Sequence, residues 1–214
     1  MTVLHTLDEV EIRSLAVGEM DNNAYLLTDR GDGAQLLVDA AAKPERLLDL
    51  VREGSGSARL DAVVTTHRHP DHHRALASVV ALTGAPSMAG ADDADAIHDA
   101  TDVPISRRLH HGDVLTVGHL TLEVIALRGH TPGSVALAYR EPTGRVHLFT
   151  GDSLFPGGPG ATRTPADFAA LMADLTDRVF GTFGDDTVVY PGHGLGTTLG
   201  VERPHLEEWR ARGW

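Results

Sequence analysis

Apolar and polar positions alternate along the first part of the chain, as is typical of strands that bury one or both faces. The predicted strands there are residues 10–17, 24–28, 35–39 and 61–66. The last of these runs (DAVVTT) is rich in apolar and β-branched residues, which favours a buried strand. The glycines of Arg30-Gly31-Asp32-Gly33 are typical of a hairpin turn between the second and third strands.

Helical periodicity separates these strands. Lys43-Pro44-Glu45 opens a pattern that places Leu47, Leu48 and Val51 on one face, and the pattern ends in the glycine–serine stretch 54–57. Further helices are predicted over 72–82 and 92–100.

The second half of the chain repeats this arrangement. Its predicted strands are residues 114–117, 120–127, 135–139, 146–150 and 187–190. A loop rich in glycine and proline, 155–165, leads into a predicted helix over 166–180, and a closing helix is expected over 204–212. No low-complexity linker separates the halves. Two facing sheets with helices outside would bury all the apolar faces, so we expect one α/β domain over residues 1–214, a four-layer α/β/β/α sandwich.

Composition narrows the possible functions. The 214 residues include 30 acidic and 18 basic side chains, for a net charge of −12, which disfavours a nucleic-acid partner. No apolar run approaches the roughly 20 residues of a membrane helix, and no signal peptide is visible, so a cytoplasmic protein without a membrane partner is expected. With no cysteine, disulfides, thiolate ligands and a cysteine nucleophile are excluded. The 13 histidines point instead to metal binding or acid–base chemistry.

One histidine cluster directly follows the predicted strand 61–66. His67 and His69 are two residues apart, so an extended segment can direct both imidazoles to the same side. Asp71 and His72 follow at the turn into the next predicted helix. Three imidazoles and a carboxylate within six residues suit zinc or a similar divalent metal.

Three further polar residues each follow a predicted strand. His130 lies in Gly129–Gly133, Asp152 comes after strand 146–150, and His193 comes after strand 187–190. Loops held by a rigid scaffold are where functional sites usually occur, so we group these three with the cluster. His73 is expected to point away from it, and we interpret the other histidines as surface or hydrogen-bonded residues: His5, His98, His110, His111, His119, His147 and His205.

Taken together, these motifs resemble the metallo-β-lactamase-fold superfamily and, within it, the glyoxalase II-like (hydroxyacylglutathione hydrolase-like) hydrolases. The resemblance rests on Asp39, the block Thr66–His72, His130, Asp152 and His193, which occur in the order of the family. It implies two metal ions at one edge of the sandwich. Matched residue by residue, the first metal would be bound by His67, His69 and His130, the second by Asp71, His72 and His193, and both by a bridging Asp152. Asp39 would orient a ligand or support its loop.

The chemistry that this resemblance implies is hydrolysis of a small thioester or ester. Two divalent cations lower the pKa of a shared water, so that a metal-bound hydroxide can attack a carbonyl carbon near pH 7. Asp71 could steer the proton of that water, which is its expected catalytic role. Zinc is expected from the ligand types, and iron or manganese also suits imidazole and carboxylate ligands.

Two departures from the family pattern concern the substrate. The loop 157–163 replaces what is commonly a glycine–arginine–threonine–aspartate run, and its Arg163 could bind a substrate carboxylate or remain solvated. Only residues 194–214 follow His193, so the helical domain that holds glutathione in larger glyoxalase II chains is not expected.

Alternative functions stay open. A persulfide dioxygenase-like enzyme would hold one iron on two histidines and an aspartate. A non-catalytic metal-binding module would use the same ligands without turnover. A homo-oligomer is compatible with either function.

Overall fold

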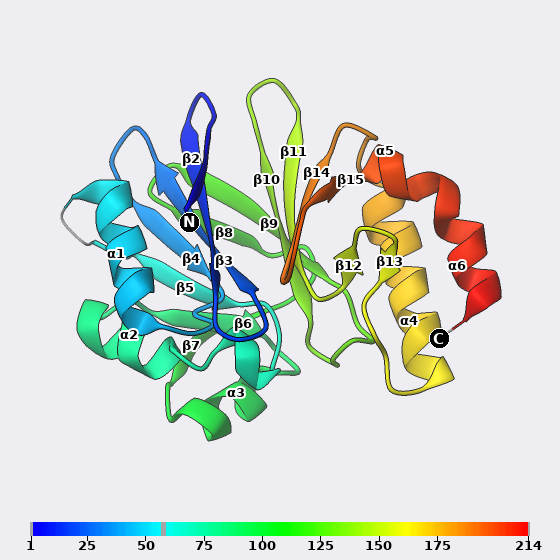
Figure 1. Cartoon of the computed structure of the whole chain (residues 1–214), viewed down its shortest axis with the longest axis horizontal. Coiled ribbons are helices and arrows are strands. Elements are labelled where there is room, and N and C mark those ends of the chain that lie inside the picture. Colours follow the sequence, from blue (N-terminus) through cyan, green and yellow to red (C-terminus); the bar gives the residue numbers. More distant parts are fainter. Residues whose placement is uncertain (1, 57–58, 214) are drawn as a thin grey trace.

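Two β-sheets lie face to face, and helices cover the outer face of each (Figure 1). This computed structural model describes residues 2–56 and 59–213. The first sheet has seven strands in sequence order: β1 (Val3–Thr6), β2 (Val10–Val17), β3 (Asn22–Asp29), β4 (Gln35–Val38), β5 (Ala62–Thr65), β6 (Ser87–Gly90) and β7 (Ile105–Leu109). Neighbours from β1 to β4 are antiparallel, and those from β4 to β7 are parallel.

The second sheet has six strands in the order β15-β14-β11-β10-β9-β8. Their bounds are β8 (Val114–Val117), β9 (Leu120–Ala126), β10 (Val135–Arg140), β11 (Val146–Gly151), β14 (Val188–Pro191) and β15 (Thr197–Thr198). A small hairpin of β12 (Leu154–Phe155) and β13 (Gly158–Pro159) follows β11. Strands β11 and β14 are parallel, so their carboxyl ends lie at the same edge of this sheet.

The helices divide between the two outer faces (Figure 1). Beside the first sheet lie α1 (Pro44–Ser55), the 3₁₀ turn η1 (Pro70–His72), α2 (Leu76–Thr83) and α3 (Ala94–Thr101). Beside the second lie α4 (Pro165–Asp174), the π-helix η2 (Leu175–Phe180), α5 (Leu199–Glu202), the 3₁₀ turn η3 (Arg203–His205) and α6 (Leu206–Arg212). Helix α4 begins as its sequence favours, because Pro165 occupies the first turn and the Thr164 hydroxyl accepts the Asp167 N–H.

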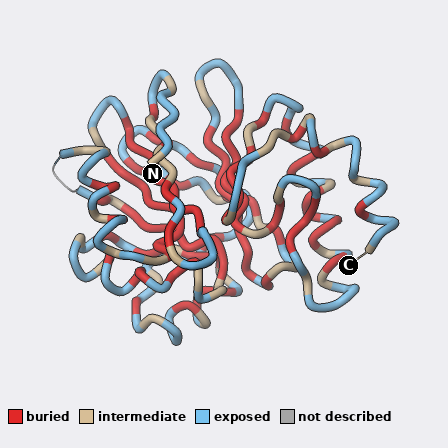
Figure 2. The backbone as a smooth tube through the Cα atoms, viewed as in Figure 1, coloured by how far each residue is buried: buried red, intermediate tan, exposed pale blue. Residues whose placement is uncertain are grey.

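Three apolar cores fill the spaces between the four layers. Ile12 and Leu36 of the first sheet meet Leu122 of the second in the central core. A second core lies between the first sheet and its helices, and a third contains Trp209 and packs α4 and α6 on the second sheet. Figure 2 shows the buried tube running through the sheets and the exposed tube in outer loops and helix faces. The predicted α/β/β/α sandwich is therefore confirmed.

Several local predictions need correction. The helix predicted over 72–82 begins only at Leu76, because Pro70–His72 form a separate 3₁₀ turn. The buried face of α1 contains Leu50 in place of Leu48, and Ser57 of the predicted glycine–serine stretch lies outside the described residues. Helix 166–180 changes to a π-helix after Asp174, the start of the closing helix is a 3₁₀ turn, and the loop 155–165 contains part of the β12–β13 hairpin.

Three strands of the first sheet were missed because their sequences lack an apolar run. Strand β1 is exposed at every residue, β6 reads Ser-Met-Ala-Gly, and β7 contains two exposed arginines. Strand β1 is placed by pairing with β2, β6 by pairing with β5, and β7 by pairing with β6, which no local pattern reveals.

Candidate metal centre

Strand ends from both sheets meet where β3 approaches β14. Asn22 pairs with His193 in an isolated antiparallel bridge, and the N–H of Asn23 donates to the Gly192 carbonyl at 2.8 Å. The cluster loop that follows β5 is tied to the second sheet by the Val135 N–H, which donates to the Thr66 carbonyl at 2.9 Å. The sequence thus brings its strand-end histidines and carboxylates to one edge of the sandwich.

The first ligand group consists of His67, His69 and His130. His67 Nε2 lies 3.1 Å from His69 Nδ1. The His130 ring lies 4.8 Å from the His67 ring and 4.6 Å from the His69 ring, between ring centres. These three side chains offer nitrogen atoms close enough together to hold one metal ion.

The second group consists of Asp71, His72 and His193. The Nε2 atoms of His72 and His193 are 3.2 Å apart. Asp71 Oδ2 lies 3.3 Å from the His193 nitrogen and 3.6 Å from the His72 nitrogen. Ligand atoms about 2.0–2.1 Å from one tetrahedral ion are roughly 3.3–3.4 Å from one another, so these distances suit a shared cation.

Asp152 lies between the two groups. Its Oδ2 is 3.9 Å from His67 Nε2 and 3.6 Å from His130 Nε2. The same oxygen is 3.5 Å from His193 Nε2, and Oδ1 is 3.4 Å from His72 Nε2. A single carboxylate therefore faces both sets of imidazoles.

Asp39 and Thr66 fix the orientation of two ligand histidines. His72 Nδ1 donates to Asp39 Oδ2 at 2.8 Å, which leaves Nε2 facing the centre. The Thr66 hydroxyl also donates to Asp39 Oδ2, and it accepts from His67 Nδ1 at 3.0 Å. Asp39 has a left-handed backbone (φ +61°) that is unusual for a residue other than glycine. The Thr66 N–H donates to its Oδ1 and helps hold this conformation.

Backbone carbonyls perform the same role for two other histidines. His130 Nδ1 donates to the Ala161 carbonyl at 2.7 Å, and His193 Nδ1 donates to the Met20 carbonyl at 2.9 Å. An imidazole that donates through one nitrogen presents the lone pair of the other, as metal-bound histidines do.

Two buried atoms of the centre have no hydrogen-bond partner among the described residues: His130 Nε2 and Asp152 Oδ1. A buried polar atom without a partner costs about 1–3 kcal/mol, and native proteins contain few. Because both atoms are electron-pair donors directed into the centre, a bound cation would satisfy them. The residues therefore fit a metal site.

Burial lowers the pKa of all three histidines of the first group, most strongly for His67. These imidazoles are therefore neutral at pH 7 and ready to donate a lone pair.

The second group behaves differently. Burial lowers the pKa of His72, but the carboxylates of Asp39 and Asp152 outweigh that effect and raise it to about 10. The Asp152 carboxylate, 3.5 Å away, raises the pKa of His193. Burial alone would raise the pKa of Asp152 and of Asp71, yet the nearby imidazoles, and for Asp71 also the Asn22 amide, hold both below the usual range. Without metal, this group holds protons that a cation must displace.

Other functional residues were not identified from the sequence. Asn22 is buried and donates from Nδ2 to Asp71 Oδ2 at 2.8 Å. Gly192 leaves no room for a side chain, since a Cβ would lie 2.2 Å from Asp152 Oδ1 and 2.7 Å from His72 Cε1. Gly192 and Asp152 were both visible in the sequence, but their close approach was not.

The buried Asp93 was also missed, and it joins two ligand loops. Its Oδ2 accepts the Arg68 N–H at 3.0 Å and the Thr131 hydroxyl at 2.5 Å, and its Oδ1 accepts the Gly133 N–H at 3.0 Å. The loop of His67 and His69 is thereby held beside the loop of His130.

Two other residues named in the sequence analysis, Arg163 and His73, lie outside the cluster, as was expected for His73. Arg163 is exposed in the loop after β13 and forms no hydrogen bond or ion pair with the described residues. His73 is buried but turns away from the cluster, and its Nε2 donates to the Arg68 carbonyl at 3.1 Å.

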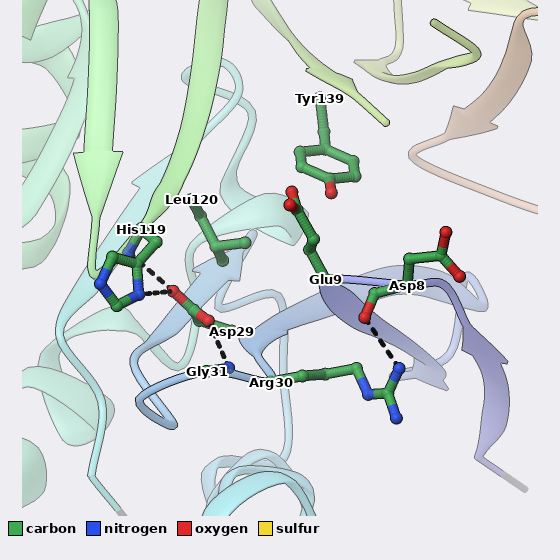
Figure 3. Close-up of a pocket in the computed structure, with 8 residues that line it drawn as sticks. All are labelled: Asp8, Glu9, Asp29, Arg30, Gly31, His119, Leu120 and Tyr139. Atoms are coloured by element: carbon green, nitrogen blue, oxygen red, sulfur yellow. Dashed lines mark hydrogen bonds and ion pairs between the residues drawn. The ribbon is translucent and has the colours of Figure 1, made fainter. Parts of the chain in front are cut away.

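A second histidine–carboxylate group lies at the tips of two hairpins, and we call it the hairpin corner: Asp29, Asp32 and His119. Figure 3 shows Asp29 beside His119 in a cavity of about 530 Å³ that Glu9 and Tyr139 also line. His119 Nδ1 lies 3.2 Å from Asp29 Oδ2 and 3.7 Å from Asp32 Oδ2.

The comparison with known families agrees with this fold and centre. Residues 17–201 match the family described as the Metallo-beta-lactamase superfamily. The chain belongs to this superfamily, and its relatives include proteins named hydroxyacylglutathione hydrolase. The resemblance inferred from the sequence is confirmed.

Individual relatives refine the comparison. A hydroxyacylglutathione hydrolase of Fuscovulum blasticum is 33% identical over 175 residues, 81% of this chain and 62% of that protein. The chain thus spans less than two thirds of the length of that relative. The crystal structure of TTHA1623 in a di-iron-bound form is 34% identical with a TM-score of 0.70, and the match covers 89% of this chain and 96% of that one. ETHE1 from Myxococcus xanthus is 30% identical with a TM-score of 0.74, over 91% and 82% of the two chains.

Within residues 2–56 and 59–213, none of the helices combines the length and the apolar character needed to cross a membrane.

Proposed function

We propose that the chain is a dinuclear metal-dependent hydrolase that cleaves a small thioester. The observation that supports this most directly is the position of Asp152. Its two oxygens face both ligand groups, and Oδ1 has no hydrogen-bond partner in the part of the chain that the structure describes. His67, His69 and His130 would hold one cation, Asp71, His72 and His193 the other, and Asp152 both.

Two divalent cations held there would lower the pKa of a shared water and polarise a carbonyl oxygen. The remaining chemistry belongs to the side chains. Asp71 is ionised, and the Asn22 amide holds its Oδ2 beside His193. This carboxylate is placed to accept the proton that the attacking water loses. Asp39 keeps His72 in one orientation throughout.

The choice of a thioester draws on the relatives named hydroxyacylglutathione hydrolase. Zinc is our proposal for the metal because imidazole and carboxylate ligands suit it, and the di-iron form of TTHA1623 makes iron the first alternative.

A second candidate, an oxygenase that uses one iron, is favoured by the unequal protonation of the two ligand groups. The first group is neutral and the second holds protons, so a single ion would bind at the first group, with Asp152 as its carboxylate ligand. Two of the three histidines of this group, together with Asp152, would supply the two imidazoles and one carboxylate that usually hold such an iron with open positions.

Turnover and metal content together decide between these functions. Protein stripped with a chelator and reloaded with zinc, iron or manganese should hydrolyse members of a thioester panel, and the stripped protein should not. Consumption of oxygen with a persulfide by a one-iron form, without thioester hydrolysis, would favour the oxygenase. A fully loaded protein that does neither would be a binding module.

A further inference from the structure

Two exposed apolar side chains, those of Met20 and Leu195, lie beside the metal centre. Among the described residues, seven large apolar side chains are about half exposed or more: Val3, Leu4, Met20, Leu82, Val114, Leu195 and Val201. Leu195 is the most exposed of these, at 84%, and lies two residues after His193. Met20 is 57% exposed, and its carbonyl accepts the hydrogen bond from the His193 ring.

The two loops that present these side chains are tied together. Asn23 Nδ2 donates to the Gly194 carbonyl at 2.9 Å and to the Pro191 carbonyl at 3.0 Å, which joins the β2–β3 turn to the loop after β14. On the hairpin after Asp152, the half-buried Phe155 has its ring centre 6.5 Å from that of His193. We call Met20, Phe155 and Leu195 the apolar rim.

A groove of about 720 Å³ shares Leu195 with this rim and extends between the edge strands of the two sheets. Its walls include Val3, Tyr25, Val188, Tyr190 and Leu195. Asn23 and Gly194 line the groove, and their chain neighbours Asn22 and His193 belong to the metal centre. The groove therefore lies one residue along the chain from two side chains of the centre.

The charges of the groove exclude a strongly anionic occupant. Of the described residues that line it, Asp21 is the only carboxylate and none is lysine or arginine. The chain as a whole has a net charge of −12. His5 is the one histidine among these lining residues, so a thiol that bears carboxylates would find no lysine or arginine here to offset their loss of water, whereas an apolar chain would gain free energy from burial.

We propose that the apolar rim and the groove bind an uncharged, apolar chain on the thiol side of the thioester substrate. This inference rests on the proposed hydrolase function and names the substrate class more narrowly. The leaving thiol extends from the metal centre over Met20 and Leu195 into the groove. This leaving thiol differs from a peptide thiol with free carboxylates, such as the glutathione in the name of the Fuscovulum blasticum relative.

A homologous series of substrates tests the proposal in the metal-loaded protein. Acetyl thioesters of straight-chain thiols from ethanethiol to octanethiol should show a falling KM at nearly constant kcat, by up to about fourfold for each added methylene. The acetyl thioester of glutathione should have a kcat/KM at least about tenfold below that of the octanethiol ester.

Variants at the rim and matched variants elsewhere locate the effect. Leu195→Ser and Met20→Ser should flatten the dependence of KM on chain length. Leu82→Ser and Val114→Ser remove exposed apolar side chains that are in neither the rim nor the groove, and should keep the full dependence. Thioester turnover without chain-length dependence, or equal effects of rim and control variants, would overturn the proposal.

A binding assay separates this inference from the hydrolase function. Alkyl thioethers with a methylene between carbonyl and sulfur cannot be hydrolysed, and calorimetry measures their affinity directly. Affinity that grows with chain length in the wild type but not in Leu195→Ser would support the groove even if no thioester were cleaved. Affinity independent of chain length would refute it, whatever the enzyme hydrolyses.

Discussion

The metal centre and the hairpin corner contain similar groups at similar distances, but they use them differently. At the corner, Asp29 accepts the N–H groups of Gly31 and His119, and Asp32 accepts the N–H of Ala34. The carboxylates are already engaged by the turns, and the His119 side chain is 78% exposed. The two hairpin turns therefore account for the hydrogen bonding of the hairpin corner on their own.

At the centre, by contrast, the hydrogen bonds are directed outward. His72, His130 and His193 each donate through the nitrogen that points away, and the inner nitrogens face Asp152. Nearness of histidine and carboxylate alone therefore does not define a metal site. A metal site also needs each imidazole to donate through its outer nitrogen, so that the lone pair of its inner nitrogen stays available.

The largest effect should follow from Asp152→Ala. Among the described residues, Asp152 is the only carboxylate that faces both groups, so its removal should release at least one metal ion and lower kcat/KM by about a thousandfold or more, equivalent to several kcal/mol of lost charge stabilisation. Elemental analysis and the thioester assay measure the two effects. Asp32→Ala at the hairpin corner is the matched control and should change neither. Two metals per chain in Asp152→Ala would disprove the bridging role.

A smaller effect is expected from Asp39→Asn. Asparagine tolerates the left-handed backbone but lacks the negative charge that holds the His72 imidazole, so metal affinity should fall about 10- to 100-fold. Competition with a chromophoric chelator measures this affinity. Asp102→Asn changes another aspartate with positive φ, exposed after α3, and should have no effect. Equal affinities of Asp39→Asn and the wild type would show that Asp39 serves the loop alone.

The third prediction concerns pH and separates the two ligand groups. At pH values below its pKa of about 10, His72 is protonated in the metal-free protein. The second group must therefore release a proton when it binds a metal ion. Its affinity should rise up to about tenfold per pH unit between pH 7 and 8.5, whereas the first group, with lowered pKa values, should show little change. Calorimetry in buffers of different ionisation enthalpy counts the protons. Two equally pH-independent binding steps would contradict this distinction.

The smallest effect should come from His119→Gln. Because the corner carboxylates remain bonded to backbone N–H groups, the metal content and kcat/KM should match the wild type within error. Loss of one metal equivalent in this variant would show that the hairpin corner is itself a metal site.

Much of this arrangement was accessible from the sequence because each ligand follows a strand end. His130, Asp152 and His193 lie beside glycines at the carboxyl ends of apolar runs, and the structure brings them to the cluster at His67–His72. The layered fold followed from the same runs, since each sheet needs two covered faces.

The rest depends on contacts between distant segments. Asn22 and Asp71 are 49 residues apart, and the Met20 carbonyl that holds His193 is 173 residues away. A carbonyl has no sequence signature. Asp93 fell within the helix predicted over 92–100, and only the fold places two ligand loops against it.

The number and identity of metal ions per chain, measured by elemental analysis of protein purified without chelators, test the dinuclear centre most directly. We expect about two equivalents of zinc, or of zinc with iron or manganese, as two groups joined by one carboxylate require. A single equivalent of iron that does not increase when excess metal is added would contradict the two-metal account and favour the oxygenase.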